Sequence, residues 1–148
     1  MEEFYCFYDS TGIITGVGST IDGTIPDKAL TCAKEVIQNP SLYVVAKGQV
    51  VESPAYEEIL KEQTVQDYFN KARIKLDAVA YSWGYDSIIF ALSYLGSTDA
   101  QYKADAEALN VWRDSFWSQA YTICAGNLPA SSGDFLAALP EEPTKPTV

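Results

Sequence analysis

Residues 64–83 read TVQDYFNKARIKLDAVAYSW, and their apolar residues recur mostly at steps of three and four. Such steps place the apolar side chains on one face of an α-helix. The members of this apolar stripe are Val65, Phe69, Ala72, Leu76, Val79, Ala80 and Trp83. Gly84 follows at once, and glycine is favoured just after the last turn of a helix. The segment therefore predicts an amphipathic helix that ends at Gly84 and buries one face.

Two more helices are predicted downstream. Residues 87–95 are short and very apolar, and we expect Asp86 to cap their free N–H groups. Residues 100–125 carry a second long stripe, and the polar residues 97–99 offer acceptors to its first turn. The members of that stripe are Tyr102, Ala106, Leu109, Trp112, Phe116, Ala120 and Ile123. Three helices with facing stripes predict a common core, and we expect the tryptophans to lie in or beside it.

The first 55 residues are typical of a small β-rich lobe. Residues 4–8 are aromatic and strand-forming, and a turn separates them from the extended pattern of residues 13–17. Residues 42–46 and 49–52 flank Lys47 and Gly48, which predicts a second hairpin with a two-residue turn. Proline and acidic residues at 26–27 predict a short helix between the hairpins, ending near Ile37.

The composition changes again after Ala125. Residues 126–148 contain Pro129, Pro140, Pro143 and Pro146, which favour extended backbone. One short apolar patch, residues 135–139, interrupts this tail. By itself such a tail is expected to be mobile. The chain is therefore predicted to be an α+β protein with a β-rich lobe at 1–55, a helical lobe at 56–125 and a Pro-rich tail at 126–148.

The charge balance excludes several kinds of partner. The 148 residues include 20 Asp and Glu against 10 Lys and Arg, a net charge of -10. Nucleic acid is a poor partner, because phosphate binding needs clustered Lys and Arg, and an anionic membrane is disfavoured for the same reason. No stretch of the sequence is apolar enough to span a bilayer, and the first residues do not resemble a signal peptide. Synthesis in a cytoplasm is the expectation.

The residue types also exclude much catalytic chemistry. The chain has no histidine, so it has no Ser-His or Cys-His nucleophile pair and no histidine-containing metal site. Cys6, Cys32 and Cys124 are far apart and odd in number, which favours buried, reduced thiols over a disulfide framework. The glycines at 12–23 do not match a nucleotide-binding loop, and the acidic residues lack calcium-loop spacing. No catalytic residue, metal site or cofactor is predicted.

Aromatic residues are the unusual feature of the composition, with 10 Tyr, 6 Phe and 3 Trp. Aromatic side chains with a polar tip suit interfaces that are half wet, although an aromatic-rich core would also use them. Seven residues are candidates for an interface with another protein or a second copy of this chain. They are Phe4, Tyr5, Phe7, Tyr8, Trp117, Phe135 and Leu136.

Residues 76–121 resemble a known family. The segment contains Gly84-Tyr85-Asp86-Ser87-Ile88, and then Trp112-Arg113-Asp114-Ser115-Phe116-Trp117. This pattern is similar to the helical domain at the end of many small bacteriophage tail proteins of the tail-fibre and tail-fibre-assembly group. The β-rich lobe is also similar to the small β unit of tail-fibre-assembly proteins. The resemblance covers about a third of the chain and brings no catalytic residue with it.

The resemblance implies a non-enzymatic tail protein that binds the tail fibre, its attachment site or other baseplate and tail proteins. It leaves open whether the protein is an assembly chaperone or a virion structural component, located first in the host cytoplasm and then in the virion tail. Two alternatives stay open on the residues alone. One is a small glycan-cleaving enzyme that uses two carboxylates, and the other is a cytoplasmic adaptor protein. Neither alternative has a motif of its own in this sequence.

Overall fold

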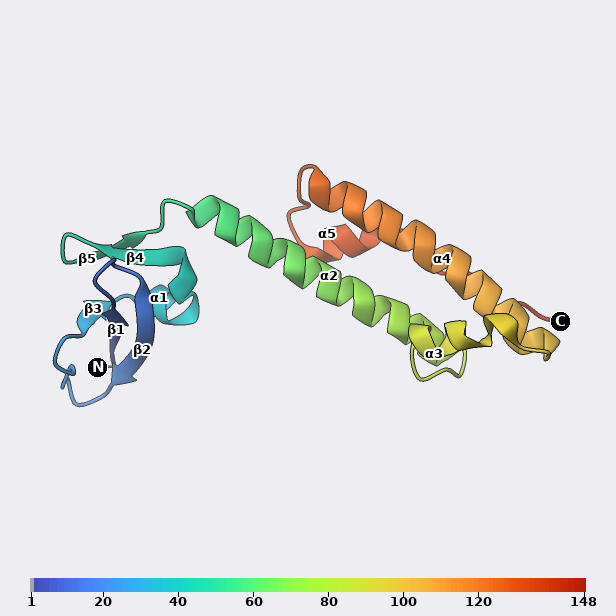
Figure 1. Ribbon diagram of the computed structural model, residues 1–148, viewed down its shortest axis with the longest axis horizontal. Coiled ribbons are helices and arrows are strands. Elements are labelled where there is room, and N and C mark those ends of the chain that lie inside the picture. The colour runs from blue at the N-terminus through green and yellow to red at the C-terminus, as the bar shows by residue number, and fades with distance from the viewer. Residues whose placement is uncertain (1) are drawn as a thin grey trace. The chain divides into compact units, whose positions relative to one another are not determined.

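The computed structural model describes residues 2–148 and confirms an α+β fold, with a small sheet region followed by several helices (Figure 1). The chain divides into two compact units, one that ends at Gln63 and one that runs from Thr64 to Val148. The boundary lies inside a long helix and not at residue 55, because the first turns of that helix belong with the β-rich unit. We describe the two units separately.

The first unit is built on a three-stranded antiparallel sheet with strand order β2-β1-β3. Its strands are β1 (Glu3–Tyr8), β2 (Ile14–Thr20) and β3 (Leu30–Cys32). Asp9 closes the first turn, because its carboxylate accepts hydrogen bonds from the backbone N–H groups of Thr11 and Ile13. The predicted first hairpin is therefore present, with a longer second strand than the sequence indicated.

A two-stranded sheet completes this unit. Its strands β4 (Tyr43–Ala46) and β5 (Gln49–Glu52) are joined by Lys47 and Gly48, both with positive φ, as a two-residue hairpin requires. The two sheets meet at Gly12, whose carbonyl accepts a hydrogen bond of 2.8 Å from the Val45 N–H. Gly12 itself has a φ of +89°, and a Cβ there would lie 2.2 Å from the Val45 carbonyl oxygen. Only glycine fits this junction without displacing a strand.

The helix predicted for residues 26–37 is wrong. Residues 30–32 form β3, which pairs with β1, and helix α1 (Lys34–Gln38) begins only after it. The 3-10 turn η1 (Pro40–Leu42) follows α1. Lys28 has a φ of +67°, which cannot continue a right-handed helix. Strand pairing thus overrides the local helix signal, and this unit buries few apolar side chains completely. They are Cys6, Val36 and Leu42.

The long helix α2 (Tyr56–Ser82) begins nine residues before Val65, the first member of the apolar stripe that predicted it. Most residues of its first two turns are polar and exposed, whereas Tyr56 and Ile59 are half-buried. The helix ends before Gly84, which has a φ of +99°, as the sequence predicted.

The remaining helices of the second unit are α3 (Ile88–Leu92), the 3-10 turn η2 (Ser93–Gly96) and α4 (Ala100–Ala125). Asp99 caps α4 as expected and accepts from the Tyr102 N–H at 3.0 Å. Asp86 does not cap α3. The side chain of Ser87 accepts from the Phe90 N–H at 3.1 Å, and Asp77 of α2 accepts from the Ile88 N–H at 2.9 Å.

The Pro-rich tail, which is expected to be mobile by itself, folds back onto the helices of its own unit and is held by them. It contains a short helix, α5 (Ser132–Ala137), which lies between α2 and α4 in Figure 1. Phe135 of α5 stacks on Tyr68 of α2, with ring centroids 4.8 Å apart. The Tyr68 hydroxyl also donates a 2.7 Å hydrogen bond to the Pro129 carbonyl. The apolar patch at 135–139 thus completes the core from the C-terminal side.

The second unit has one continuous hydrophobic core. Trp112 is buried as predicted, while Trp83 and Trp117 are half-buried and pack against the core. The fully buried members come from α2, α3, α4 and the tail together. They are Tyr68, Ala72, Leu76, Val79, Ala80, Tyr85, Ile88, Ala91, Leu109, Trp112, Phe116, Ala120, Cys124, Phe135 and Leu139. No helix in residues 2–148 is long and apolar enough to cross a membrane.

Candidate interaction surfaces

The aromatic residues of β1 point to two faces of the sheet. Tyr5 and Phe7 share one face, with ring centroids 5.8 Å apart in an edge-to-face arrangement. Their rings lie over Gly18 and Gly16 of β2, where a Cβ would stand 2.6 Å from the Tyr5 ring and 3.4 Å from the Phe7 ring. Gly18 and Gly16 have no side chain and therefore leave room for the two rings. Both side chains stay half-buried, which leaves an aromatic face open to solvent.

The opposite face of β1 turns inward. Cys6 is fully buried, Phe4 is half-buried, and Tyr8 at the strand end is 40% exposed. Of the four predicted interface residues in β1, Tyr8 is exposed, and Phe4, Tyr5 and Phe7 are half-buried. Alternation along the strand places Phe4 with the buried Cys6 and places Tyr5 with Phe7, and the sequence alone does not say which set is inside.

Trp117 lies in a second exposed aromatic cluster, on the helical unit. Its ring centroid is 5.8 Å from that of Phe69 and 5.9 Å from that of Tyr121, and the Phe69 and Tyr121 rings are 5.1 Å apart. Tyr121 is 60% exposed, while Phe69 and Trp117 are half-buried. We name these three residues the Trp117 cluster. It places a half-wet aromatic surface across α2 and α4, which suits a protein contact.

Phe135 is not an interface residue, because it is completely buried. Leu136 is half-buried against the core, as Trp117 is. Both belong to α5, which Ser131 caps by accepting from the Asp134 N–H at 3.1 Å. The Phe135 ring is then used by the molecule itself and cannot serve a partner.

A buried polar network, which the sequence did not indicate, holds the end of the tail. Asp105 of α4 is 1% exposed and accepts hydrogen bonds from the Tyr85 hydroxyl at 2.8 Å and the Gln101 amide at 2.7 Å. Lys145 of the tail lies 3.4 Å from the same carboxylate and also donates to the Trp83 carbonyl at 2.7 Å. Burial, together with the nearby Asp105 charge, raises the pKa of the Tyr85 hydroxyl. The network neutralises a buried carboxylate with a lysine 40 positions later in the chain.

The prolines of the tail explain how an extended segment can be fixed in place. Extended Pro-rich backbone leaves its carbonyls without partners in the same segment. Trp112 donates to the Pro140 carbonyl at 3.3 Å, and Gln101 donates to the Pro146 carbonyl at 2.9 Å. Donors on α4 thus supply the hydrogen bonds that the tail cannot make internally.

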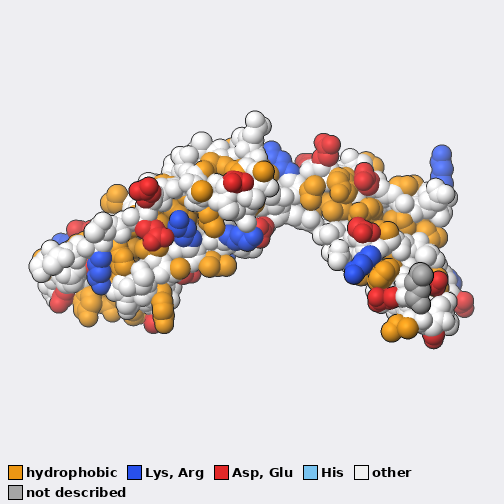
Figure 2. Space-filling model, turned by 180° about the vertical axis from the view of Figure 1, so that it is seen from behind, with side chains coloured by type: hydrophobic (Ala, Val, Ile, Leu, Met, Phe, Trp, Pro, Cys, Tyr) orange, Lys and Arg blue, Asp and Glu red, His pale blue; other side chains and the backbone are white. Residues whose placement is uncertain are grey.

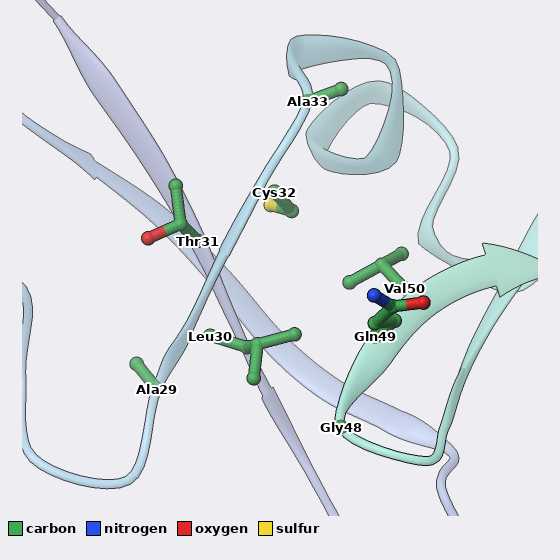
Figure 3. A pocket seen from close by; sticks show the side chains of 8 residues that line it. All are labelled: Ala29, Leu30, Thr31, Cys32, Ala33, Gly48, Gln49 and Val50. Atoms are coloured by element: carbon green, nitrogen blue, oxygen red, sulfur yellow. The ribbon is translucent and has the colours of Figure 1, made fainter.

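A groove of about 600 Å³ lies in the first unit, between β3 and β5. Figure 3 shows its two walls, formed by residues 29–33 on one side and residues 48–50 on the other. The lining is mixed. Leu30 and Val50 contribute apolar side chains, and Thr31 and Gln49 contribute polar ones. No charged side chain lines it.

The chemistry available elsewhere on the chain is limited. No group of three or more Cys, Asp or Glu side chains within residues 2–148 is placed to hold a metal ion. Asp105, the one buried acidic side chain in this described range, is fully engaged by its three partners. Cys6, Cys32 and Cys124 are free thiols, and burial raises the pKa of each. On the face drawn in Figure 2, Lys and Arg side chains lie scattered, while apolar side chains reach the surface of both units.

Comparisons with known proteins find no relative. No protein-family model, no curated protein and no solved structure matches the chain.

Proposed function

We propose that this chain is a non-enzymatic bacteriophage tail protein that binds the tail fibre or its attachment site. It acts either as a virion structural component or as a chaperone of fibre assembly. The proposal starts from the resemblance of residues 76–121 to the helical domain of small phage tail proteins.

The observation that carries the proposal is that both parts of the matching pattern pack into one core. Tyr85 and Ile88 of the Gly-Tyr-Asp-Ser-Ile turn are 5% and 4% exposed, and Trp112 of the second part is 5% exposed. Ser87 and Asp77 fix the turn by capping α3. The resembling residues therefore behave as one structural module and not as two unrelated stretches of sequence, which supports a shared helical domain.

A binding role is supported by the surfaces that this module and the β-rich unit leave open. The Trp117 cluster and the face of Tyr5 and Phe7 are aromatic and half-exposed. Aromatic residues are enriched at protein interfaces because they combine a large apolar area with few rotatable bonds. The net charge of -10 favours a protein partner over nucleic acid.

The proposal is tested by co-purification with fibre and tail proteins and by mass spectrometry of purified particles. A copy number that matches other tail components means a structural component, and presence only in infected lysates means a chaperone. Trp117→Ala should weaken capture of the partner by tenfold or more, which is the range of an interface hot spot. Ile74→Ala is the matched control, since Ile74 of α2 is 67% exposed and outside the cluster.

Two results would contradict the proposal. One is that neither particles nor fibre complexes from infected cells contain the chain. The other is that the purified protein cleaves cell-surface polysaccharide at a rate that a single Asp or Glu substitution abolishes.

A further inference from the structure

The groove between β3 and β5 exposes the edge of a strand and not its face. Side chains alternate between the two faces of a strand, so a surface along one face touches every second residue. All five consecutive residues from Ala29 to Ala33 line this groove, and so do the three consecutive residues from Gly48 to Val50 (Figure 3). A ligand that lies along the edges of the two strands would contact consecutive residues in this way.

Within residues 2–148, no strand is hydrogen-bonded to the edge of β3 that faces away from β1, and β5 lies across the groove from it. Leu30, Thr31 and Cys32 pair with β1 on one side only, because β3 is the last strand in the order β2-β1-β3. In such an edge strand, alternate backbone N–H and C=O groups point away from the single neighbour. β5 is likewise paired only with β4. An extended peptide can form backbone hydrogen bonds with the free N–H and C=O groups of such a strand edge.

Three of the four lysines of this unit adjoin the groove in sequence. Lys28, Lys34 and Lys47 are the only basic residues among the first 55. Each of them directly adjoins a groove-lining segment in sequence, and each is exposed. None forms an ion pair anywhere in residues 2–148. Three unpaired cations around an uncharged groove, in an otherwise acidic chain, match an acidic ligand.

Two of these lysines also hold a backbone conformation that lysine does not favour. Lys28 and Lys47 have φ values of 67° and 53°, and they are the two non-glycine residues with positive φ in the described part of the chain. Asparagine or glycine adopts this conformation more readily, and Asn-Gly is the preferred pair in a two-residue hairpin turn such as residues 47–48. Lysine at both positions therefore supplies a positive charge at some cost in the local stability of the backbone.

We propose that this groove binds an extended acidic segment of another protein. The segment adds as a strand to the free edge of β3, and its carboxylates lie next to Lys28, Lys34 and Lys47. A second copy of this chain is a poorer occupant, because β2, the other outer strand of the three-stranded sheet, carries no acidic side chain. The inference goes beyond the proposed function, since it holds whether or not the partner is a tail fibre.

The test uses the full chain and a synthetic peptide. The peptide has alternating valine and threonine in its centre, two glutamates at each end, and blocked termini. Titration into the ¹⁵N-labelled protein should shift the amide signals of residues 29–33 and 48–50 first. A peptide with the same centre and lysines in place of the glutamates should bind at least tenfold more weakly.

The matched variants separate charge from fold. Lys28→Asn with Lys47→Asn keeps residues that tolerate positive φ, so the protein should stay folded and melt no lower than the parent. The same double variant should bind the acidic peptide about tenfold more weakly, the range expected for two exposed ion pairs. Lys61→Asn is the control, because Lys61 is exposed on α2, belongs to the same unit and lies outside the groove.

Strand addition is tested separately from charge by N-methylating alternate amides of the acidic peptide, which should abolish binding. Equal binding of the methylated peptide would overturn strand addition, and equal binding of the lysine peptide would overturn the acidic ligand. Shifts outside the groove, or none at all, would overturn the site. Concentration-dependent shifts at residues 29–33 without any peptide would assign the groove to a second copy instead. Because no fibre is needed, these outcomes are independent of the test of the proposed function.

Discussion

The two units of this protein are stabilised by different means. The helical unit buries fifteen side chains in one core that includes its own C-terminal tail. The β-rich unit buries three hydrophobic side chains and depends on strand pairing, a turn closed by Asp9 and a glycine junction between its sheets. Buried apolar area is the main source of stability, so the difference places most of the folding free energy in the helical unit. The β-rich unit keeps more of its strand edges available for a partner.

The largest expected effect comes from the tail end of the helical core. Phe135→Ala should lower the free energy of unfolding by about 3–5 kcal/mol, because it removes a completely buried ring that stacks on Tyr68. Urea unfolding followed by far-ultraviolet circular dichroism measures the change. Phe90→Ala is the control, since Phe90 is 44% exposed. A loss below about 1 kcal/mol would show that the tail is not part of the core.

The next effect tests whether backbone geometry dominates the β-rich unit. Gly12→Ala should destabilise that unit by about 2–3 kcal/mol, because the left-handed backbone and the clash with the Val45 carbonyl act together. Gly48→Ala shares the positive φ but meets no atom within 4 Å, so it should cost only about 1 kcal/mol. Hydrogen exchange of the Val45 amide reports the junction directly. Similar losses for both variants would mean that contact between the sheets contributes little.

A smaller effect is expected at the polar network of the tail. Lys145→Met keeps the aliphatic stem but leaves the buried Asp105 carboxylate without its cation, which should cost about 1–2 kcal/mol. The comparison is Lys103→Met, whose partner Glu107 is exposed and lies 3.9 Å away, and which should cost less than about 0.5 kcal/mol. Thermal unfolding of both variants measures the difference. An equal and small change would mean that hydrogen bonds from Tyr85 and Gln101 are sufficient.

The smallest effect concerns the thiols. Burial first, and then the neighbouring Cys6, raises the pKa of Cys32 to about 11. At pH 8 its alkylation should be about a hundredfold slower in the folded protein than after unfolding, because the thiolate is the reactive form. The unfolded thiol ionises near pH 8.5, so the contribution of Cys32 to the stability of the β-rich unit is constant below about pH 8 and is lost as the pH rises toward 11. Mass spectrometry of timed alkylation checks the rate, and fast labelling at pH 8 would contradict the burial.

Sequence periodicity predicted the elements whose pattern is local. The stripe at 64–83, the Asp99 cap of α4 and the Lys47-Gly48 hairpin all appear as expected, because each depends on residues a few positions apart. The helix expected at residues 26–37 failed for the opposite reason. Its central residues pair with β1, which lies more than 20 positions away in sequence.

The candidate sites show the same difference between features set by neighbouring residues and features set by residues distant in sequence. The aromatic composition indicates Tyr5, Phe7, Tyr8 and Trp117 as interface candidates, and in the structure each is exposed or half-buried. Phe135 was assigned to the surface because a Pro-rich tail predicts no partner within its own chain, and it is in fact at the centre of a core. The groove was not identified, since no motif marks two strand edges that are distant in sequence.

By itself, the sequence determined the α+β class, the two long helices, the acidic character and the absence of histidine chemistry. Only the tertiary structure decided that the tail closes the helical core, that Lys145 neutralises Asp105, and that β3 and β5 leave a groove between lysines. The physical reason is the range of the forces involved. Helix stripes, caps and turns are set by neighbours along the chain, whereas burial, ion pairing and free strand edges depend on residues that meet only when the chain has folded.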